Sequence, residues 1–234
     1  MIQDAGQMNM KPLLITIDGP AGAGKTTVSR MLADRLGFVY VDTGALYRGV
    51  AFEAAARGLA PDDEEALGAL SAGLDLRFEH TESGVRLFSG ERDITGSIRT
   101  PEITMLASAI SARPVVRQAL LDVQKRLGAK KAAVFEGRDM GTVVFPDADV
   151  KFFLIADLKA RAMRRFLEYR DAGAPRFETV LEDMEKRDAN DSSRAVAPLK
   201  PAGDAVIIDS TDLSPEAVVE KMVALIRSLP ESSR

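Results

Sequence analysis

The stretch LLITIDGPAGAGKTT, residues 13–27, decides the fold class of this 234-residue chain. It begins with an apolar, β-branched run at 13–18, which is typical of a buried strand. A glycine-rich loop follows at 19–24, and apolar residues then recur with the period of an amphipathic helix as far as Gly37. A strand, a glycine-rich loop and a helix in this order predict an α/β fold with a ligand-binding loop between strand and helix.

The loop itself fits the pattern G-x-x-x-x-G-K-[ST]. Glycines let the backbone turn with positive φ and bring its N–H groups close to phosphate oxygens. The helix that begins near Lys25 directs the positive end of its dipole at the same oxygens. The Lys25 ammonium suits the β- and γ-phosphates of a nucleotide, and the Thr26 hydroxyl suits Mg²⁺. These features predict a P-loop, and the residues expected to contact ATP are Gly19, Pro20, Ala21, Gly22, Ala23, Gly24, Lys25, Thr26 and Thr27.

Further apolar strands alternate with amphipathic helices along the rest of the chain. The strands are expected at 38–41, 132–136, 150–156 and 205–209, and the main helices at 101–127, 158–171, 177–189 and 215–229. This alternation predicts a five-stranded parallel sheet covered by helices on both faces, which is a three-layer αβα architecture.

The long separation between the second and third strands predicts an insertion, because one crossover needs far fewer residues. We expect a core formed by 12–59 and 130–230, with an insert at 60–129. Two alternating segments in the insert, 74–78 and 85–89, predict a small antiparallel hairpin. The arginine-rich stretch 158–176 is expected to form a lid, and residues 1–11 a disordered leader.

Composition excludes several classes of protein. The chain has 31 Lys and Arg against 35 Asp and Glu, a net charge of −4, so no global field favours nucleic acid or an anionic membrane. It has no Cys and one His, His80, which removes thiolate zinc sites and makes a serine triad a poor hypothesis. No apolar run has the length of a membrane span, so a cytoplasmic location is expected.

Candidate site residues follow the strands at their carboxyl ends, where ligands bind in open parallel sheets. Glu136 ends the strand 132–136, and we predict that it binds Mg²⁺ together with Thr26; the alternative is a carboxylate that caps the next turn. Arg161 and Arg165 lie on one face of the lid helix and suit a developing phosphoryl charge, although a solvated charged face remains open. Arg187 and Asp191 could likewise be an ordinary surface pair.

Five segments together carry a resemblance to a known family: GPAGAGKTT (19–27), DTGALYR (42–48), IRTPE (98–102), EGRDMGTVVFPDADVKFFL (136–154) and SSRAVAPL (192–199). They resemble the bacterial-type cytidylate kinases, a family of nucleoside monophosphate kinases with the P-loop NTPase fold. The resemblance implies transfer of the γ-phosphoryl group of ATP to CMP or dCMP with Mg²⁺, by a monomer with a core, a monophosphate-binding insert and a lid.

The resemblance also implies a role for individual residues. Cytosine would be bound by Ser108, Arg117 and Asp139, and the sugar by Arg187 and Asp191. The acceptor phosphate would be bound by Arg48, Arg138 and Arg194, with Thr43 near the same pocket. The residues expected to act on the transferring group are Lys25, Arg138, Arg161 and Arg165.

Two alternatives remain open from the sequence. Another monophosphate kinase, specific for UMP or AMP, would share the P-loop and the lid, but a purine cannot present the same edge to the cytosine-reading residues. A non-catalytic ATP-binding switch module would keep Lys25 and Thr26, but it has no use for a second anion pocket.

Overall fold

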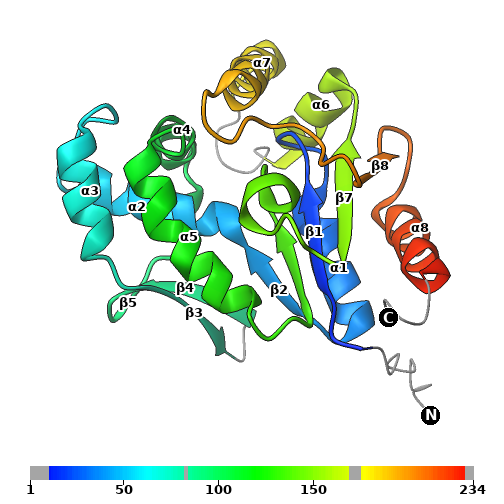
Figure 1. Ribbon diagram of the computed structural model, residues 1–234. Coiled ribbons are helices and arrows are strands. Elements are labelled where there is room, and N and C mark those ends of the chain that lie inside the picture. Colours follow the sequence, from blue (N-terminus) through cyan, green and yellow to red (C-terminus); the bar gives the residue numbers. More distant parts are fainter. Residues whose placement is uncertain (1–10, 82–83, 169–174, 230–234) are drawn as a thin grey trace. The chain divides into compact units, whose positions relative to one another are not determined.

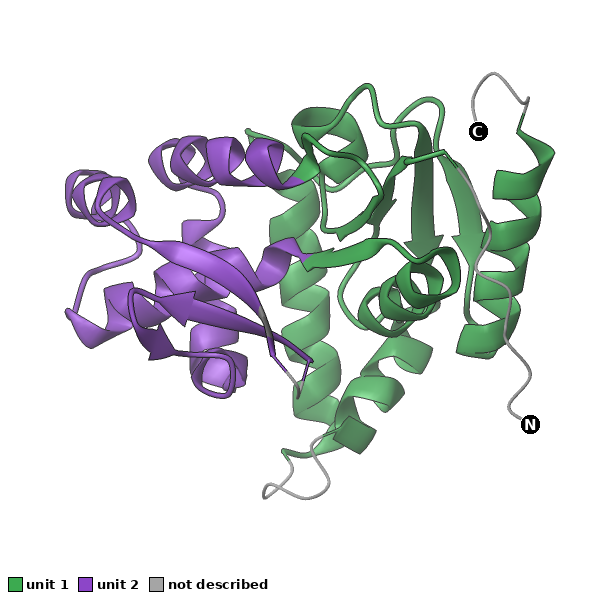
Figure 2. Cartoon of the chain, turned by 90° about the horizontal axis from the view of Figure 1, so that it is seen from below, with its two compact units in different colours: residues 1–41, 128–234 green, residues 42–127 purple. Residues whose placement is uncertain are grey.

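The computed structural model describes residues 11–81, 84–168 and 175–229. The chain forms two compact units (Figure 2). Unit 1 comprises residues 1–41 and 128–234, and unit 2 comprises residues 42–127. The expected leader lies, apart from Lys11, outside the described residues.

Unit 1 is built on a five-stranded sheet in the order β2-β6-β1-β7-β8 (Figure 1). Its strands are β1 (Leu14–Asp18), β2 (Val39–Asp42), β6 (Ala133–Glu136), β7 (Val150–Ile155) and β8 (Val206–Asp209). β1 pairs in parallel with β6 and β7, and β7 pairs in parallel with β8. The five strands expected from the sequence are thus present, and the predicted fold class is confirmed.

One face of this sheet carries the larger apolar core of unit 1. Alternate residues of β1, including Ile15 and Ile17, pack there against α1 (Lys25–Leu36) and α8 (Pro215–Ser228). Left-handed glycines, Gly24 and Gly37, bound α1 at its two ends. Such residues stop a helix cleanly because glycine tolerates positive φ. The burial of α1 against β1 fixes the P-loop between them.

The other face of β1 carries Thr16 and Asp18, because strand side chains alternate. A short π-helical segment, η2 (Met140–Val144), lies over this face. A Cβ atom at Gly141 would stand 3.0 Å from Thr16 Oγ1, so glycine is what lets the backbone of η2 approach β1 so closely. This approach brings the chain after β6 against the end of β1.

The helix α6 (Leu158–Glu168) occupies most of the described part of the expected lid, 158–176, and α7 (Phe177–Ser193) begins directly after it. Residues 169–174 of the predicted lid lie outside the described residues. α6 and α7 share a small apolar cluster with the P-loop, formed by Ala21, Ala162, Val180 and Met184. The helices α6 and α7 are therefore packed directly on the P-loop.

Unit 2 has its own apolar core and its own small sheet. Its helices are α2 (Thr43–Ala56), α3 (Glu64–Ala72), η1 (Ser97–Arg99), α4 (Pro101–Ile110) and α5 (Pro114–Gly128), the last of which ends one residue beyond the unit. The expected hairpin is present as β3 (Leu76–Thr81) and β4 (Gly84–Ser89), with a short third strand, β5 (Arg92–Asp93).

Two details of unit 2 differ from the sequence-based expectation. A single helix over 101–127 is wrong, since the chain forms α4 and α5 with a break before Pro114. Proline lacks an N–H and disfavours helical geometry in the residue before it, so it begins a helix more readily than it continues one. The insert was expected to begin at residue 60, whereas unit 2 begins at Asp42 because α2 buries its apolar residues in the core of unit 2.

Gly19, the first residue of the P-loop, offers a direct test of this packing. Its φ is +147°, and an added Cβ would stand 2.0 Å from the carbonyl oxygen of Leu154 on β7. We expect Gly19→Ala to lower the free energy of unfolding by about 3 kcal/mol or more, because backbone must move. Gly24→Ala is the control: its Cβ would meet nothing within 4 Å, so left-handed strain alone should cost about 1 kcal/mol. Equal losses in denaturant titrations would contradict this account.

Candidate functional site

Lys25 is the buried cation of the P-loop. Its side chain lies at the start of α1, 7% exposed, and Nζ donates a hydrogen bond to the carbonyl oxygen of Pro20 at 2.7 Å. Burial lowers the pKa of Lys25 well below its usual value, Arg138 lowers it further, and Glu136 opposes the shift. A buried ammonium with this environment is stabilised when an anion arrives, which is what a phosphate-binding lysine requires.

Thr26 and Glu136 are brought together at the same place. Thr26 Oγ1 donates to Glu136 Oε1 at 2.9 Å across 110 residues of sequence, and Glu136 is 6% exposed. The described residues contain no group of three or more His, Cys, Asp or Glu side chains that could hold a metal ion. A hydroxyl beside one carboxylate is nevertheless a suitable donor set for Mg²⁺, which takes its remaining ligands from water and nucleotide phosphates.

Asp18 is a buried carboxylate that sequence reasoning did not single out. Its two oxygens accept hydrogen bonds from the backbone N–H groups of Met140 and Gly141, at 2.9 and 2.8 Å. Burial raises the pKa of Asp18 to about 6, and the two N–H groups partly offset that effect. Asp18 therefore ties the end of β1 to the segment that carries Arg138 and Asp139. The feature of the sequence that could have identified Asp18 is its position as the last residue of the strand before the P-loop.

Asp191, on α7, lies among three arginines of unit 1. Its Oδ2 accepts from Arg138 Nε at 2.9 Å, and Oδ1 lies 3.3 Å from a guanidinium nitrogen of Arg194. Burial would raise the pKa of Asp191, but the charges of Arg138, Arg187 and Arg194 outweigh it and hold that pKa below its usual value. Asp191 is 3% exposed, so the interpretation of Arg187 and Asp191 as an ordinary surface pair is wrong.

Asp139 lies beside this group on the segment after β6. It is 2% exposed and precedes η2, whose residues Val143 and Val144 donate their N–H groups to the Asp139 carbonyl oxygen. Its negative charge contributes to the raised pKa of Asp18. The expected cytosine-binding carboxylate thus lies on a hydrogen-bonded turn close to the P-loop strand.

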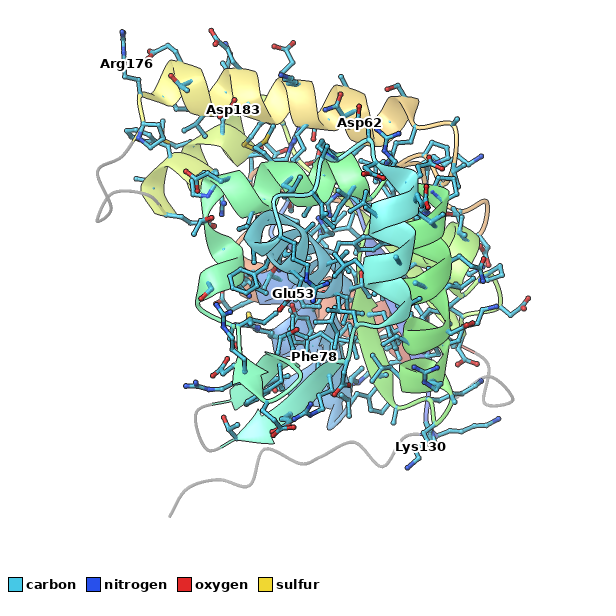
Figure 3. The ribbon with its side chains drawn as sticks, turned by 90° about the vertical axis from the view of Figure 1, so that its left-hand side faces the viewer. Glu53, Asp62, Phe78, Lys130, Arg176 and Asp183 are labelled. Atoms are coloured by element: carbon cyan, nitrogen blue, oxygen red, sulfur yellow. The ribbon has the colours of Figure 1, made fainter. Side chains whose placement is uncertain are left out.

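The two arginines of α6 that were expected to act on the transferring group differ in their surroundings. Arg161 is buried, donates to the carbonyl oxygens of Ala156 and Ala21, and pairs with Asp188 at 2.6 Å. Arg165 is 32% exposed and pairs with Glu168 one turn away at 2.7 Å. Arg176 projects outward at the start of α7 (Figure 3), with its side chain 85% exposed. Arg161 is therefore fixed against the P-loop, whereas Arg165 is accessible.

In unit 2, Asp42 organises the start of α2. Its Oδ1 caps the helix by accepting from the N–H of Ala45 at 2.9 Å, and its Oδ2 accepts from Arg48 at 2.8 Å. Thr43 is 1% exposed in the first turn of the same helix. The Arg48 Nε atom is buried and has no hydrogen-bond partner among the described residues. Arg48 is therefore oriented by Asp42 and retains a donor for a ligand.

Ser108 and Arg117 form a second group in unit 2. Arg117 is 8% exposed; it donates to the carbonyl oxygen of Ser111 at 3.3 Å, and its guanidinium lies 5.8 Å from the ring centroid of Tyr47. The Ser108 hydroxyl is buried with no partner among the described residues. A buried hydroxyl left in this state is consistent with a polar ligand that completes it.

The predicted residues thus form one group in each unit. Unit 1 brings together Lys25, Thr26, Glu136, Arg138, Asp139, Arg187, Asp191 and Arg194. Unit 2 holds Thr43, Arg48, Ser108 and Arg117. Thr27, which was expected to contact ATP, lies on the exposed side of α1.

None of the helices that the structure describes is long and apolar enough to cross a membrane.

A P-loop on a parallel sheet, with a hydroxyl–carboxylate pair and an arginine cluster beside it, defines a phosphotransferase of the P-loop kinase class. A shikimate kinase from Bacteroides thetaiotaomicron shares the fold, with a TM-score of 0.50, 11% identity and coverage of 93% of this chain and 99% of that one.

The family model for cytidylate kinase matches residues 15–228. A cytidylate kinase of Geobacter sulfurreducens is 47% identical over 216 residues, which cover 92% of this chain and 93% of the relative. A cytidylate kinase of Shouchella clausii is 45% identical over 214 residues, 91% of this chain and 95% of the relative. The chain belongs to the cytidylate kinase family.

The raised pKa of Asp18 leads to a prediction about stability and pH. Because the pKa rises from 3.8 to about 6 on folding, the native state binds more protons between these values. The stability that this group contributes is complete below about pH 4 and is lost as pH rises through 6. Relative to Asp18→Asn, the wild-type free energy of unfolding should fall across that window by as much as about 3 kcal/mol.

Denaturant titrations of both proteins at several pH values check this prediction. Titration of the Met140 and Gly141 amide resonances with a midpoint near pH 6 would identify the group directly. A difference between the two proteins that does not change with pH would contradict the raised pKa.

Proposed function

We propose that this protein transfers the γ-phosphoryl group of ATP to CMP or dCMP, with ADP and CDP or dCDP as products. The observation that carries the proposal is the pairing of two anion sites in unit 1: a buried P-loop lysine and an arginine cluster around Asp191. One site suits the phosphates of a donor and the other those of an acceptor. Membership of the cytidylate kinase family supports the choice of acceptor.

Mg²⁺ would be held by Thr26 and Glu136, whose side chains touch at 2.9 Å. When bound, the ion supplies positive charge to the phosphates of the donor. Lys25, released from Pro20, would bind the β- and γ-phosphates, and the backbone N–H groups of the P-loop would bind them from the other side.

The chemistry of the acceptor explains why the site holds arginines and not a histidine base. A nucleotide phosphate is already anionic near neutral pH, so no proton has to be removed before it attacks. Catalysis then consists of alignment, exclusion of water and neutralisation of charge. We assign the neutralisation of charge to Lys25, Arg138, Arg161 and Arg165. Of these, Arg161 already donates a hydrogen bond to the carbonyl oxygen of Ala21 in the P-loop.

For the acceptor we assign Arg48, Arg138 and Arg194 to the phosphate, and Thr43 to the same pocket. Arginine suits these positions because its fork binds two phosphate oxygens at once. The remaining assignments are Arg187 and Asp191 to the sugar and Ser108, Arg117 and Asp139 to cytosine. We also propose that the protein acts as a monomer in the cytoplasm.

The proposed substrate is tested by ADP formation from ATP and Mg²⁺ with a panel of monophosphates. We expect the highest kcat/KM with CMP or dCMP, lower values with UMP, and little turnover with AMP. The cytosine amino group needs an acceptor such as Asp139, and a base without that group has no donor to offer this carboxylate. Fastest turnover with AMP, or ADP formation that no acceptor stimulates, would overturn the assignment.

The role of the P-loop lysine predicts that Lys25→Ala lowers kcat by about 100-fold or more while the fold is retained. The reason is that removal of a buried cation leaves the charge of the transferring group uncompensated. Activity and circular dichroism of the same preparation provide the measurement. Turnover within a few fold of wild type would remove Lys25 from the mechanism.

The sugar-binding role predicts that Arg187→Ala raises KM for CMP by about 10- to 100-fold, the range expected when hydrogen bonds to a charged group are lost. KM for ATP should stay within about twofold. Arg35→Ala is the control, because Arg35 lies on α1 with its side chain half-exposed and paired with Glu220. A loss confined to ATP would contradict this assignment.

A further inference from the structure

The segment IRTPE carries an arginine, Arg99, to which the assignments above give no role. Arg99 is the last residue of η1, immediately before the residue that caps α4. Its guanidinium approaches Asp42 Oδ2 at 3.5 Å, the same oxygen that Arg48 contacts at 2.8 Å. Two cations of unit 2 thus converge on one carboxylate oxygen.

The charges at this point do not balance. Asp42 contributes one negative charge, and its other oxygen is already used by the N–H of Ala45 at the start of α2. Arg48 and Arg99 contribute two positive charges, which leaves a local excess of one. Like charges that share a single counter-ion repel each other, and an anion between them relieves the repulsion.

Both arginines keep capacity for a further partner. A guanidinium has five N–H donors, and the Nε atom of Arg48 is buried without a partner among the described residues. The side chain of Arg99 is 52% exposed, and its contact with Asp42 is longer than a good charge-assisted hydrogen bond. Arg99 is therefore able to leave Asp42 for a ligand, whereas Arg48 is held in place.

The backbone at Arg99 is fixed, so its side chain moves from a defined position. Ile98 is 1% exposed in the core of unit 2, and its N–H donates to the carbonyl oxygen of Ile94 at 3.2 Å. Thr100 caps α4 by accepting from the N–H of Ile103 at 3.3 Å. A guanidinium on such a base is suited to bind one ligand in one place.

We propose that Arg99 binds the phosphate of the acceptor nucleotide together with Arg48, and that Asp42 holds both guanidinium groups in the absence of ligand. The proposal rests on the proposed function, because it takes the anion to be the phosphate of CMP or dCMP. The donor phosphates of ATP are the other source of the same chemistry, and the two sources are distinguished by experiment.

The test compares steady-state kinetics of Arg99→Ala with those of a matched control, Arg57→Ala. Arg57 lies in the same unit, and its side chain is also 52% exposed, but it follows the last residue of α2 and pairs with Glu53 of that helix. Arg99→Ala should raise KM for CMP by about tenfold, with kcat and KM for ATP within about twofold of wild type. Arg57→Ala should change none of these values, and Arg99→Lys should recover part of the loss.

Three results would overturn the proposal. The first is a KM for CMP in Arg99→Ala that matches wild type and the Arg57→Ala control. The second is a rise in KM for ATP in place of CMP. The third is that Arg99→Ala weakens inhibition by cytidine as much as it raises KM for CMP. Cytidine lacks the phosphate, so this result would assign Arg99 to the nucleoside or to the fold.

A double-mutant cycle with Arg48→Ala separates direct binding from positioning. If Arg99 contacts the phosphate, Arg99→Ala still raises KM for CMP when Arg48 is absent; if that effect disappears, Arg99 acts only through Arg48 and the proposal is wrong. Failure of the proposed function has a different signature, because the wild-type protein itself would then show no CMP-dependent turnover.

Discussion

The parallel pairing of β1 with β6 is the interaction on which the site of unit 1 depends. Ile17 lies opposite Glu136, and the N–H of Gly137 donates to the carbonyl oxygen of Ile17 at 3.1 Å. This register places the carboxyl ends of both strands side by side, so that the P-loop after β1 meets the segment after β6. A slip of one residue would turn Glu136 to the other face of the sheet and separate it from Thr26.

The site is also a solution to an electrostatic problem. A pocket for two polyanions needs many cations, and cations brought together without ligand repel one another. Buried carboxylates offset this repulsion: Asp191 lies among three arginines, and Glu136 and Asp18 act on the charge of Lys25. The side chains are thereby oriented before a nucleotide arrives, which reduces the reorganisation that the reaction requires.

Much of this arrangement was predictable because it depends on local patterns. The P-loop spacing, the apolar strands and the alternating hairpin segments each report short-range rules, and the five-stranded sheet and the small antiparallel sheet follow from them. The break before Pro114 was also readable, because proline begins a helix more readily than it continues one. The boundary at Asp42 depended on which core buries α2, which sequence spacing does not state.

Other features could not be predicted from patterns of this kind. Asp18 meets Met140 across 122 residues, through backbone N–H groups that have no sequence signature of their own. The π-helical turn that presents those groups depends on the close approach that Gly141 allows. The different surroundings of Arg161 and Arg165 could not be predicted either. Both residues lie on one face of α6, and it is the contact of Arg161 with the carbonyl oxygen of Ala21 that distinguishes them.

The stacking of Arg117 over Tyr47 has an optical consequence. The chain has no tryptophan and three tyrosines, so tyrosine dominates its ultraviolet emission. Tyr47 lies within 5.8 Å of the guanidinium assigned to cytosine, and a shift of that cation on binding would alter the polarity around the phenol ring. The protein therefore carries an intrinsic fluorophore at the place where the acceptor base is proposed to bind, and occupancy could be followed without a label.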